Sequence, residues 1–296
     1  MLSETETQRI SAVPNQTGQV ETPSGKAAKD ENFPVGSFLI RRDLRPHVAT
    51  FYAFARAIDD IADNPEASAE EKIDRLDAMA EAVAGQAYAD DPAFSKAIAL
   101  HHSLVETNVP VDHPHALIDA FRQDAVKSRY ADWDDLMRYC DRSAAPVGRY
   151  LLDLHGEDRA LFQGADALCN ALQVINHLQD CGDDYAEMDR VYIPQDWLTE
   201  AGGETADLAR PKASQGLRLT MDKMLEATDE LLAEARTFPP ALRSRRLAME
   251  SNVIIVIAER LVQALKQRDP LAERIELSKP EMLRAAASGI VRTFFR

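Results

Sequence analysis

Residues 167–184 of the chain read Ala-Leu-Cys-Asn-Ala-Leu-Gln-Val-Ile-Asn-His-Leu-Gln-Asp-Cys-Gly-Asp-Asp. The stretch is mainly apolar as far as Ile175 and then ends in carboxylates. Asp180 and Asp184 are four residues apart, so a helix would place both on one face. A carboxylate cluster at the end of an apolar helix points inward more often than one on a polar helix, and buried carboxylates need cations. The stretch therefore predicts a buried helix that carries an acidic cluster.

A second stretch of the same kind lies earlier in the chain. Residues 51–58, Phe-Tyr-Ala-Phe-Ala-Arg-Ala-Ile, precede Asp59, Asp60 and Asp63. Like charges four residues apart cost a helix roughly 0.2–0.5 kcal/mol per pair, which solvent or a divalent cation must offset. Because Asp and Glu supply 49 of 296 residues, a solvated acidic face would explain either pair alone. Together the two clusters predict a cage for a magnesium-bound diphosphate, since Mg²⁺ combines one or two carboxylates with water and phosphate oxygens.

The fold class expected from the whole sequence is all-α. Gly is scarce, at 12 residues, and no long run of alternating Val, Ile and Thr occurs. Residues 253–258, Val-Ile-Ile-Val-Ile-Ala, look strand-like but lie in a long pattern without Gly or Pro, so we interpret them as buried helix. Helical patterns cover residues 47–63, 68–84, 91–106, 114–127, 132–153, 158–182, 214–236, 240–267 and 279–293, and the largest loop region is 185–213.

Composition limits the domain organisation and the class of function. Residues 1–30 are polar and predict a disordered tail, which leaves residues 31–296 as one domain. A net charge of −15 argues against a nucleic-acid partner. The three cysteines lack metal-like spacing and suit a reducing compartment. Without a long apolar span or a signal-peptide core, we expect a cytoplasmic protein.

Five blocks between Asn32 and the C-terminus occur in a set order. They are residues 51–63, residues 124–130, residues 139–148 (Tyr-Cys-Asp-Arg-Ser-Ala-Ala-Pro-Val-Gly), residues 173–184 and residues 190–194 (Arg-Val-Tyr-Ile-Pro). Together they resemble the head-to-head isoprenyl diphosphate synthases, the family of squalene, phytoene and dehydrosqualene synthases. The resemblance implies a single-domain isoprenoid-synthase helical bundle around a central cavity.

Two departures from the better-known members are informative. Gln179 stands where they usually carry Arg, and Ala144-Ala145-Pro146 differs from the usual Ala-Gly-Thr. With residues 32–37, these features resemble the hydroxysqualene synthase branch of bacterial hopanoid synthesis. That branch implies magnesium-dependent ionisation of presqualene diphosphate and capture of the cation by water, without NADPH. It also implies functional coupling to a presqualene diphosphate synthase and to a flavin-dependent hydroxysqualene reductase.

The resemblance also implies the site residues. Several Mg²⁺ ions, bridged by diphosphate, would be held by Asp59, Asp60, Asp63, Asn176, Asp180 and Asp184. The substrate-binding residues would be Ser37, Arg45, Arg56, Gln173, Asn176 and Arg190. Tyr52 and Tyr139 would steer the carbocation through their ring faces. A surface ion pair for Arg190 and a helix cap for Ser37 are equally open, and we interpret His177 as a packed neutral side chain.

Three alternatives stay open. The chain could instead be a presqualene diphosphate or phytoene-type synthase that condenses two prenyl diphosphates. It could also be a non-catalytic helical assembly factor, although such proteins usually lose the motif aspartates that this chain keeps. Residues 279–296 predict a last helix that docks on the bundle, or a basic amphipathic helix that contacts a membrane surface.

Overall fold

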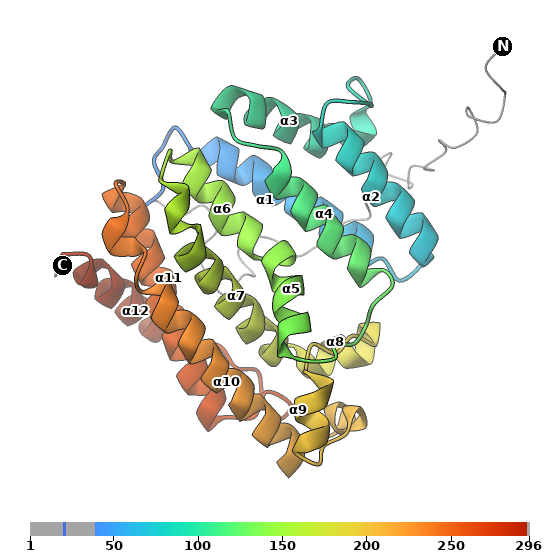
Figure 1. Ribbon diagram of the computed structural model, residues 1–296, viewed down its shortest axis with the longest axis vertical. Coiled ribbons are helices and arrows are strands. Elements are labelled where there is room, and N and C mark those ends of the chain that lie inside the picture. Colours follow the sequence, from blue (N-terminus) through green and yellow to red (C-terminus); the bar gives the residue numbers. More distant parts are fainter. Residues whose placement is uncertain (1–19, 22–38, 295–296) are drawn as a thin grey trace. The chain divides into compact units, whose positions relative to one another are not determined.

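The structure, a computed structural model, describes residues 20–21 and 39–294, and within them the regular structure is helical (Figure 1). In this part of the chain the only β-type pairing is one parallel bridge between Arg129 and Val191. The prediction of an all-α fold is therefore confirmed. The chain divides into two compact units, residues 1–26 with 49–126 and residues 27–48 with 127–296. Helix α1, Arg45–Ala62, begins in the second unit and continues in the first.

The first unit contains most of α1 together with α2 (Ala69–Val83), the short η2 (Pro92–Phe94), α3 (Ser95–Thr107) and α4 (Asp112–Asp124). Helix α2 packs against α3 and α4. It begins with a capping box in which Ser68 and Glu71 exchange hydrogen bonds, as the sequence predicts. Of the expected tail, the structure describes Val20 and Glu21, which are buried, and Glu21 pairs with Lys96 at 2.7 Å. The rest of residues 1–30 lies outside the described residues.

The second unit is built around α7. Its other elements are α5 (Trp133–Ser143), α6 (Ala145–Leu154), η3 (Arg159–Leu161), α7 (Phe162–Gln179), α8 (Cys181–Met188), α9 (Gln195–Glu200), η4 (Thr205–Ala209), α10 (Gln215–Ala235), η5 (Pro239–Ala241), α11 (Arg245–Gln267) and α12 (Lys279–Arg292). Helix α7 packs against α5, α6, α10 and α11, and α11 also packs against α12. Apolar side chains are therefore buried on several sides of α7, which carries the second acidic cluster at its C-terminal end.

Three boundaries differ from the sequence prediction. The helix expected over residues 132–153 is divided between α5 and α6 at Ala144, which has φ −123° and ψ −49°. Pro146 lies in the first turn of α6, where its missing N–H costs nothing, whereas in a continuous helix it would remove a hydrogen bond. The helix expected over 158–182 ends at Gln179, and α8 and α9 occupy part of the region expected as loop.

Helix α11 confirms the interpretation of residues 253–258 as helix. Val253, Ile255, Val256 and Ile257 are all buried there. Its N-cap residue Ser244 accepts a hydrogen bond from Leu247 N–H at 3.3 Å. From far along the chain, the Glu157 carboxylate accepts hydrogen bonds from the backbone N–H groups of Arg243 (2.9 Å) and Ser244 (2.7 Å). These amides would otherwise lack partners at the helix start.

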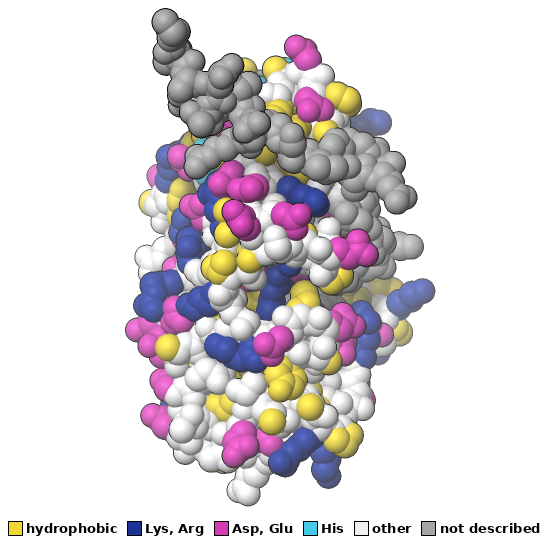
Figure 2. Space-filling model, turned by 90° about the vertical axis from the view of Figure 1, so that its right-hand side faces the viewer, with side chains coloured by type: hydrophobic (Ala, Val, Ile, Leu, Met, Phe, Trp, Pro, Cys, Tyr) yellow, Lys and Arg dark blue, Asp and Glu magenta, His cyan; other side chains and the backbone are white. Residues whose placement is uncertain are grey.

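The surface mixes charges of both signs. On the face shown in Figure 2, Lys and Arg side chains alternate with Asp and Glu, and neither sign forms a continuous field among the residues that are coloured. Among the helices that the structure describes, none combines the length and the apolar character needed to cross a bilayer.

Candidate active site

The first acidic cluster lies at the C-terminal end of α1, in the first unit. Phe54, Ala57 and Ile58 on this helix are fully buried, which fixes the face on which the carboxylates lie. Arg56 donates from Nη1 to Asp59 Oδ2 at 2.5 Å and from Nη2 to Asp60 Oδ1 at 3.2 Å. The helix thus supplies its own cation to its acidic end.

The charge of this cluster is not balanced by Arg56. Burial, and after it repulsion from Asp63, raise the pKa of Asp59 to about 7, against the lowering effect of Arg56. Asp60 and Asp124 add smaller repulsive contributions. Asp124, at the end of α4, is 8% exposed and Asp60 is 7% exposed, so water screens the charge of neither carboxylate well. Since carboxylate oxygens are the ligands that Mg²⁺ prefers, this donor set fits a divalent cation.

Asp124 was quoted in the sequence only as part of a family block and not as a site residue. Its repulsion of Asp59 now places it beside the first cluster. The signal available was its position as an acidic residue at the C-terminal end of a helix, as in the two clusters. Contact between α4 and the end of α1 could not be read from the spacing.

The second acidic cluster spans the junction of α7 and α8, in the second unit. Helix α7 stops at Gln179, and Asp180 has φ −102° and ψ 6°. Backbone hydrogen bonds still join the cluster in steps of four, from Asp180 N–H to Asn176 O (2.9 Å) and from Asp184 N–H to Asp180 O (2.8 Å). Starting a new helix at Cys181 puts Asp184 in a first turn, where the helix dipole favours negative charge.

The four expected ligand residues of α7 and α8 differ in exposure. Asp180 is exposed, whereas Gln173, Asn176 and Asp184 are half-buried. Gln173 and Asn176 are three residues apart and lie along one side of α7, and Asp180 follows directly after the end of this helix. The structure therefore brings together the residues that the sequence assigned to this cluster, although on two helices and not on one.

Gln179, the residue that departs from the family pattern, has a structural contact. Its side-chain amide donates to the backbone carbonyl of Ile275, which is buried in the segment between α11 and α12. The amide thus ties the end of α7 to that segment. An Arg here would have to satisfy the carbonyl differently.

An aromatic cluster lies directly beside the second acidic cluster. We define it as Tyr130, Tyr139, His177 and Tyr192, all of which are buried. The His177 and Tyr192 rings stack with centroids 3.6 Å apart, and Tyr139 lies 5.6 Å from Tyr192 and 6.0 Å from His177. Burial lowers the pKa of His177 to about 3, and nearby Arg190 lowers it as well. His177 is therefore a packed, neutral side chain, as the sequence analysis interpreted it.

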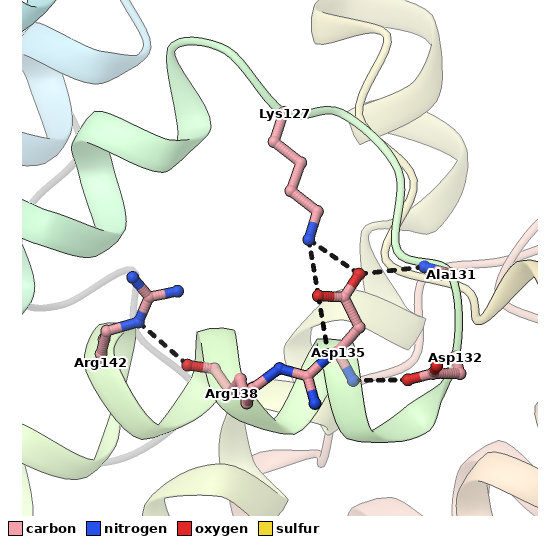
Figure 3. A network of polar contacts seen from close by, with 6 residues as sticks. All are labelled: Lys127, Ala131, Asp132, Asp135, Arg138 and Arg142. Carbon is pink, nitrogen blue, oxygen red and sulfur yellow. Dashed lines mark hydrogen bonds and ion pairs between the residues drawn. The ribbon is translucent and has the colours of Figure 1, made fainter.

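A polar network around Asp135 joins the chain segment before α5 to the start of that helix (Figure 3). Lys127 donates from Nζ to both oxygens of Asp135 at 2.7 Å, and it lies over the Tyr130 ring at 4.6 Å. Asp135 also accepts from the backbone N–H of Ala131 at 3.1 Å. Burial raises the pKa of Asp135, but the hydrogen bonds from Lys127 and Ala131 lower it below its usual value. The ammonium group of Lys127 is thus committed to Asp135.

The remaining basic candidates lie in different surroundings. Arg45 donates from Nε to the carbonyl of Ile40 at 3.0 Å, and Arg190 is 8% exposed. Arg129 pairs with Asp189 at 2.5 Å. A surface ion pair, the alternative raised for Arg190, is incompatible with its burial. Ser37 lies outside the described residues.

The structure groups the predicted site residues by unit. Tyr52, Arg56, Asp59, Asp60 and Asp63 belong to the first unit. The second unit contains the others that the structure describes, namely Arg45, Tyr139, Gln173, Asn176, Asp180, Asp184 and Arg190. Among the described residues, no three His, Cys, Asp or Glu side chains already converge as a preformed metal site. Each cluster by itself offers carboxylate oxygens, the ligand type that Mg²⁺ prefers.

Known proteins are similar to this chain in sequence over most of its length. Residues 26–281 match the family described as squalene/phytoene synthase. The chain is 40% identical over 283 residues to the hydroxysqualene synthase of Rhodopseudomonas palustris, covering 94% of this chain and 96% of that one. It is 43% identical over 270 residues to the hydroxysqualene synthase of Zymomonas mobilis, covering 91% and 90%. A crystal structure of a squalene synthase from Alicyclobacillus acidocaldarius superposes with a TM-score of 0.69 at 33% identity, covering 79% and 87%.

Proposed function

Because the chain belongs to the squalene/phytoene synthase family, we propose that it is a hydroxysqualene synthase. It would convert presqualene diphosphate and water into hydroxysqualene and diphosphate. The observation that carries this proposal is the 40% identity to a hydroxysqualene synthase over 94% of the chain, with both acidic clusters inside the matched length. The departures at Gln179 and Ala144-Ala145-Pro146 favour the same branch of the family.

The first step is departure of the diphosphate, whose negative charge must be neutralised as the carbon–oxygen bond breaks. Mg²⁺, when bound, would supply the positive charge that neutralises the diphosphate. We propose that Asp59, Asp60 and Asp63 bind some of the Mg²⁺ ions. Asn176, Asp180 and Asp184 would bind the others. The raised pKa of Asp59 supports this assignment, because a cluster with excess negative charge gains most from a cation.

The positively charged side chains take different parts in this scheme. Arg45 and Arg190 would bind the diphosphate, with Gln173 and Ser37 as further polar contacts. Arg56 already donates to Asp59 and Asp60, so we propose that it orients these carboxylates as well as contacting the diphosphate. Loss of Arg56 should therefore affect the orientation of the Asp59 and Asp60 carboxylates more than the binding of the diphosphate.

The aromatic side chains would act on the carbocation. We propose that Tyr139 in the aromatic cluster and Tyr52 on α1 would stabilise the positive charge through their ring faces. His177 stays neutral, so no imidazolium repels the cation. The carbon–oxygen bond breaks with its electron pair going to the diphosphate, and the cyclopropane opens to an allylic cation. Water then forms the new carbon–oxygen bond and loses a proton. Since water captures the cation, no hydride donor is needed.

We also propose the setting of this reaction. The protein would work in the cytoplasm, taking its substrate from an enzyme that joins two farnesyl diphosphates. A flavin-dependent reductase would remove the product. The support for this setting is the resemblance to the hydroxysqualene synthase branch, in which the three steps belong to three enzymes.

Product analysis tests the proposal. Purified full-length protein is incubated with presqualene diphosphate and Mg²⁺, without a reductant, and the products are separated by gas chromatography and mass spectrometry. The expected result is hydroxysqualene, with diphosphate release that stops when EDTA removes the metal. Consumption of farnesyl diphosphate alone would instead indicate a synthase that condenses two prenyl diphosphates. Squalene formed only with NADPH would indicate a one-enzyme squalene synthase.

A further inference from the structure

Helix α12 docks on α11 through its smallest side chains. Ala285 and Gly289 are its buried residues. A Cβ atom added to Gly289 would lie 2.5 Å from the Cα of Val253, so the two helix backbones are in close contact. Arg292 fixes the end of the helix by donating to both oxygens of Glu259 at 2.9 and 2.8 Å.

Three large apolar side chains of the α12 segment lie on the opposite face and are exposed. Leu283 is 72% exposed, Val291 is 51% exposed, and Phe294, just after the helix, is 67% exposed. With exposed Ala287, their spacing of four, four and three residues forms one stripe along the helix. We call Leu283, Ala287, Val291 and Phe294 the outer stripe. A helix that docks on a bundle normally buries its large apolar side chains, but in α12 Met282 and Ile290 are only half-buried and the large members of the outer stripe are exposed.

The charges beside the outer stripe are basic. Helix α12 carries Lys279, Arg284 and Arg292 against one acidic residue, Glu281, although the whole chain has a net charge of −15. On the helical wheel Lys279 and Arg284 border the stripe on its two sides, whereas Arg292 turns toward Glu259. Side chains of this type extend along an apolar surface and place their charge in the headgroup layer.

We propose that the outer stripe of α12 docks on the surface of an anionic lipid bilayer. A helix with an apolar face and basic flanks lies in the interface plane, with its apolar side chains below the headgroups. The basic residues beside the stripe favour an anionic bilayer as the partner, because its negative surface attracts them. The same surface repels the acidic remainder of the chain, so α12 is the part that faces it. The benefit of such docking rests on the proposed function, since a C30 diphosphate and its alcohol both partition into lipid.

Vesicle binding of the full-length protein tests the docking surface without substrate. Sedimentation with phosphatidylglycerol vesicles is compared with sedimentation with phosphatidylcholine vesicles. The double variant Leu283→Ser, Phe294→Ser should bind both kinds at least about tenfold more weakly, since two apolar anchors are lost. Arg284→Glu should weaken binding about tenfold on phosphatidylglycerol and leave phosphatidylcholine unaffected. Leu219→Ser, which changes an exposed leucine (52%) on α10, is the matched control and should bind like the unaltered chain.

Three outcomes would overturn the docking proposal. They are absence of vesicle binding by the unaltered protein, unchanged binding of the double variant, and a dimer in sedimentation velocity that the double variant abolishes. The last would show that a second copy covers the stripe. Turnover of detergent-dispersed presqualene diphosphate should be the same in all four proteins. Its absence from the unaltered protein would contradict the proposed function and leave the vesicle result standing.

Discussion

The two acidic clusters share a spacing but differ in their surroundings. The cluster on α1 is half-buried to buried, contains its own guanidinium and raises the pKa of Asp59 to about 7. The cluster on α7 and α8 includes the exposed Asp180 and coincides with a helix junction. Carboxylates at i and i+4 therefore do not define an electrostatic environment by themselves. The first cluster stores repulsion that a cation would relieve, whereas solvent already screens the second.

The largest expected effect separates catalysis from stability. Both Asp59→Ala and Asp180→Ala should lower the turnover of presqualene diphosphate by a factor of about 10³ or more, because each removes a proposed metal ligand whose charge acts on the leaving group. In the metal-free protein the two variants should differ. Loss of Asp59 relieves repulsion and should raise the melting temperature by roughly 2 °C, whereas loss of exposed Asp180 should leave it unchanged.

Calorimetry in EDTA measures this difference, and activity is measured with Mg²⁺. Near-normal turnover in either variant would remove that residue from the site. Equal melting temperatures for the two variants would show that the clusters are electrostatically alike, contrary to the comparison above.

The next effect is a pH dependence that belongs to the first cluster alone. Because the folded-state pKa of Asp59 is raised to about 7, its contribution to stability is fully present below the unfolded-state pKa near 4 and is lost as the pH rises through 7. The free energy of unfolding of the metal-free protein should therefore fall between about pH 4 and pH 7 by more than that of Asp59→Asn. Urea unfolding at several pH values measures it. Parallel curves for the two proteins would contradict the raised pKa.

The smallest expected effect concerns the aromatic cluster beside the second acidic cluster. His177→Phe keeps a flat ring against Tyr192 and removes no charge, because the histidine is already neutral. Turnover should change by less than about threefold, and its pH profile should keep its shape. His177→Leu, which loses the stack, is the comparison variant and should lower the melting temperature more. A large loss of turnover in His177→Phe alone would mean that the imidazole nitrogen takes part in the reaction.

The sequence was sufficient for the elements and for most members of each cluster. Apolar periodicity identified α7 and α11, and Ser68 with Glu71 marked the start of α2. The break at Asp180 was missed because spacing alone does not show whether a helix continues or restarts one residue later. Asp124 was missed as a site residue because its proximity to Asp59 depends on how α4 packs.

The large residues of the C-terminal segment were identified from the sequence, but their direction was not. The apolar pattern of residues 279–294 is compatible with either face of α12 turned inward. Gly289 decides the matter, since only a residue without a side chain permits the approach to Val253. The sequence thus predicts a membrane contact for this segment, and the packing of α12 on α11 defines the surface that would make it.

The cap that Glu157 places on α11 bears on the order in which the second unit folds. Its carboxylate and the two amides it binds are 86 and 87 residues apart in the chain, so these two hydrogen bonds cannot form by local contacts, whereas the Ser244 side chain caps Leu247 N–H locally. Closing a loop of that length costs chain entropy before the hydrogen bonds form. The amides of Arg243 and Ser244 should therefore acquire their protection late in refolding, after the middle of the helix has packed against α7 and α10.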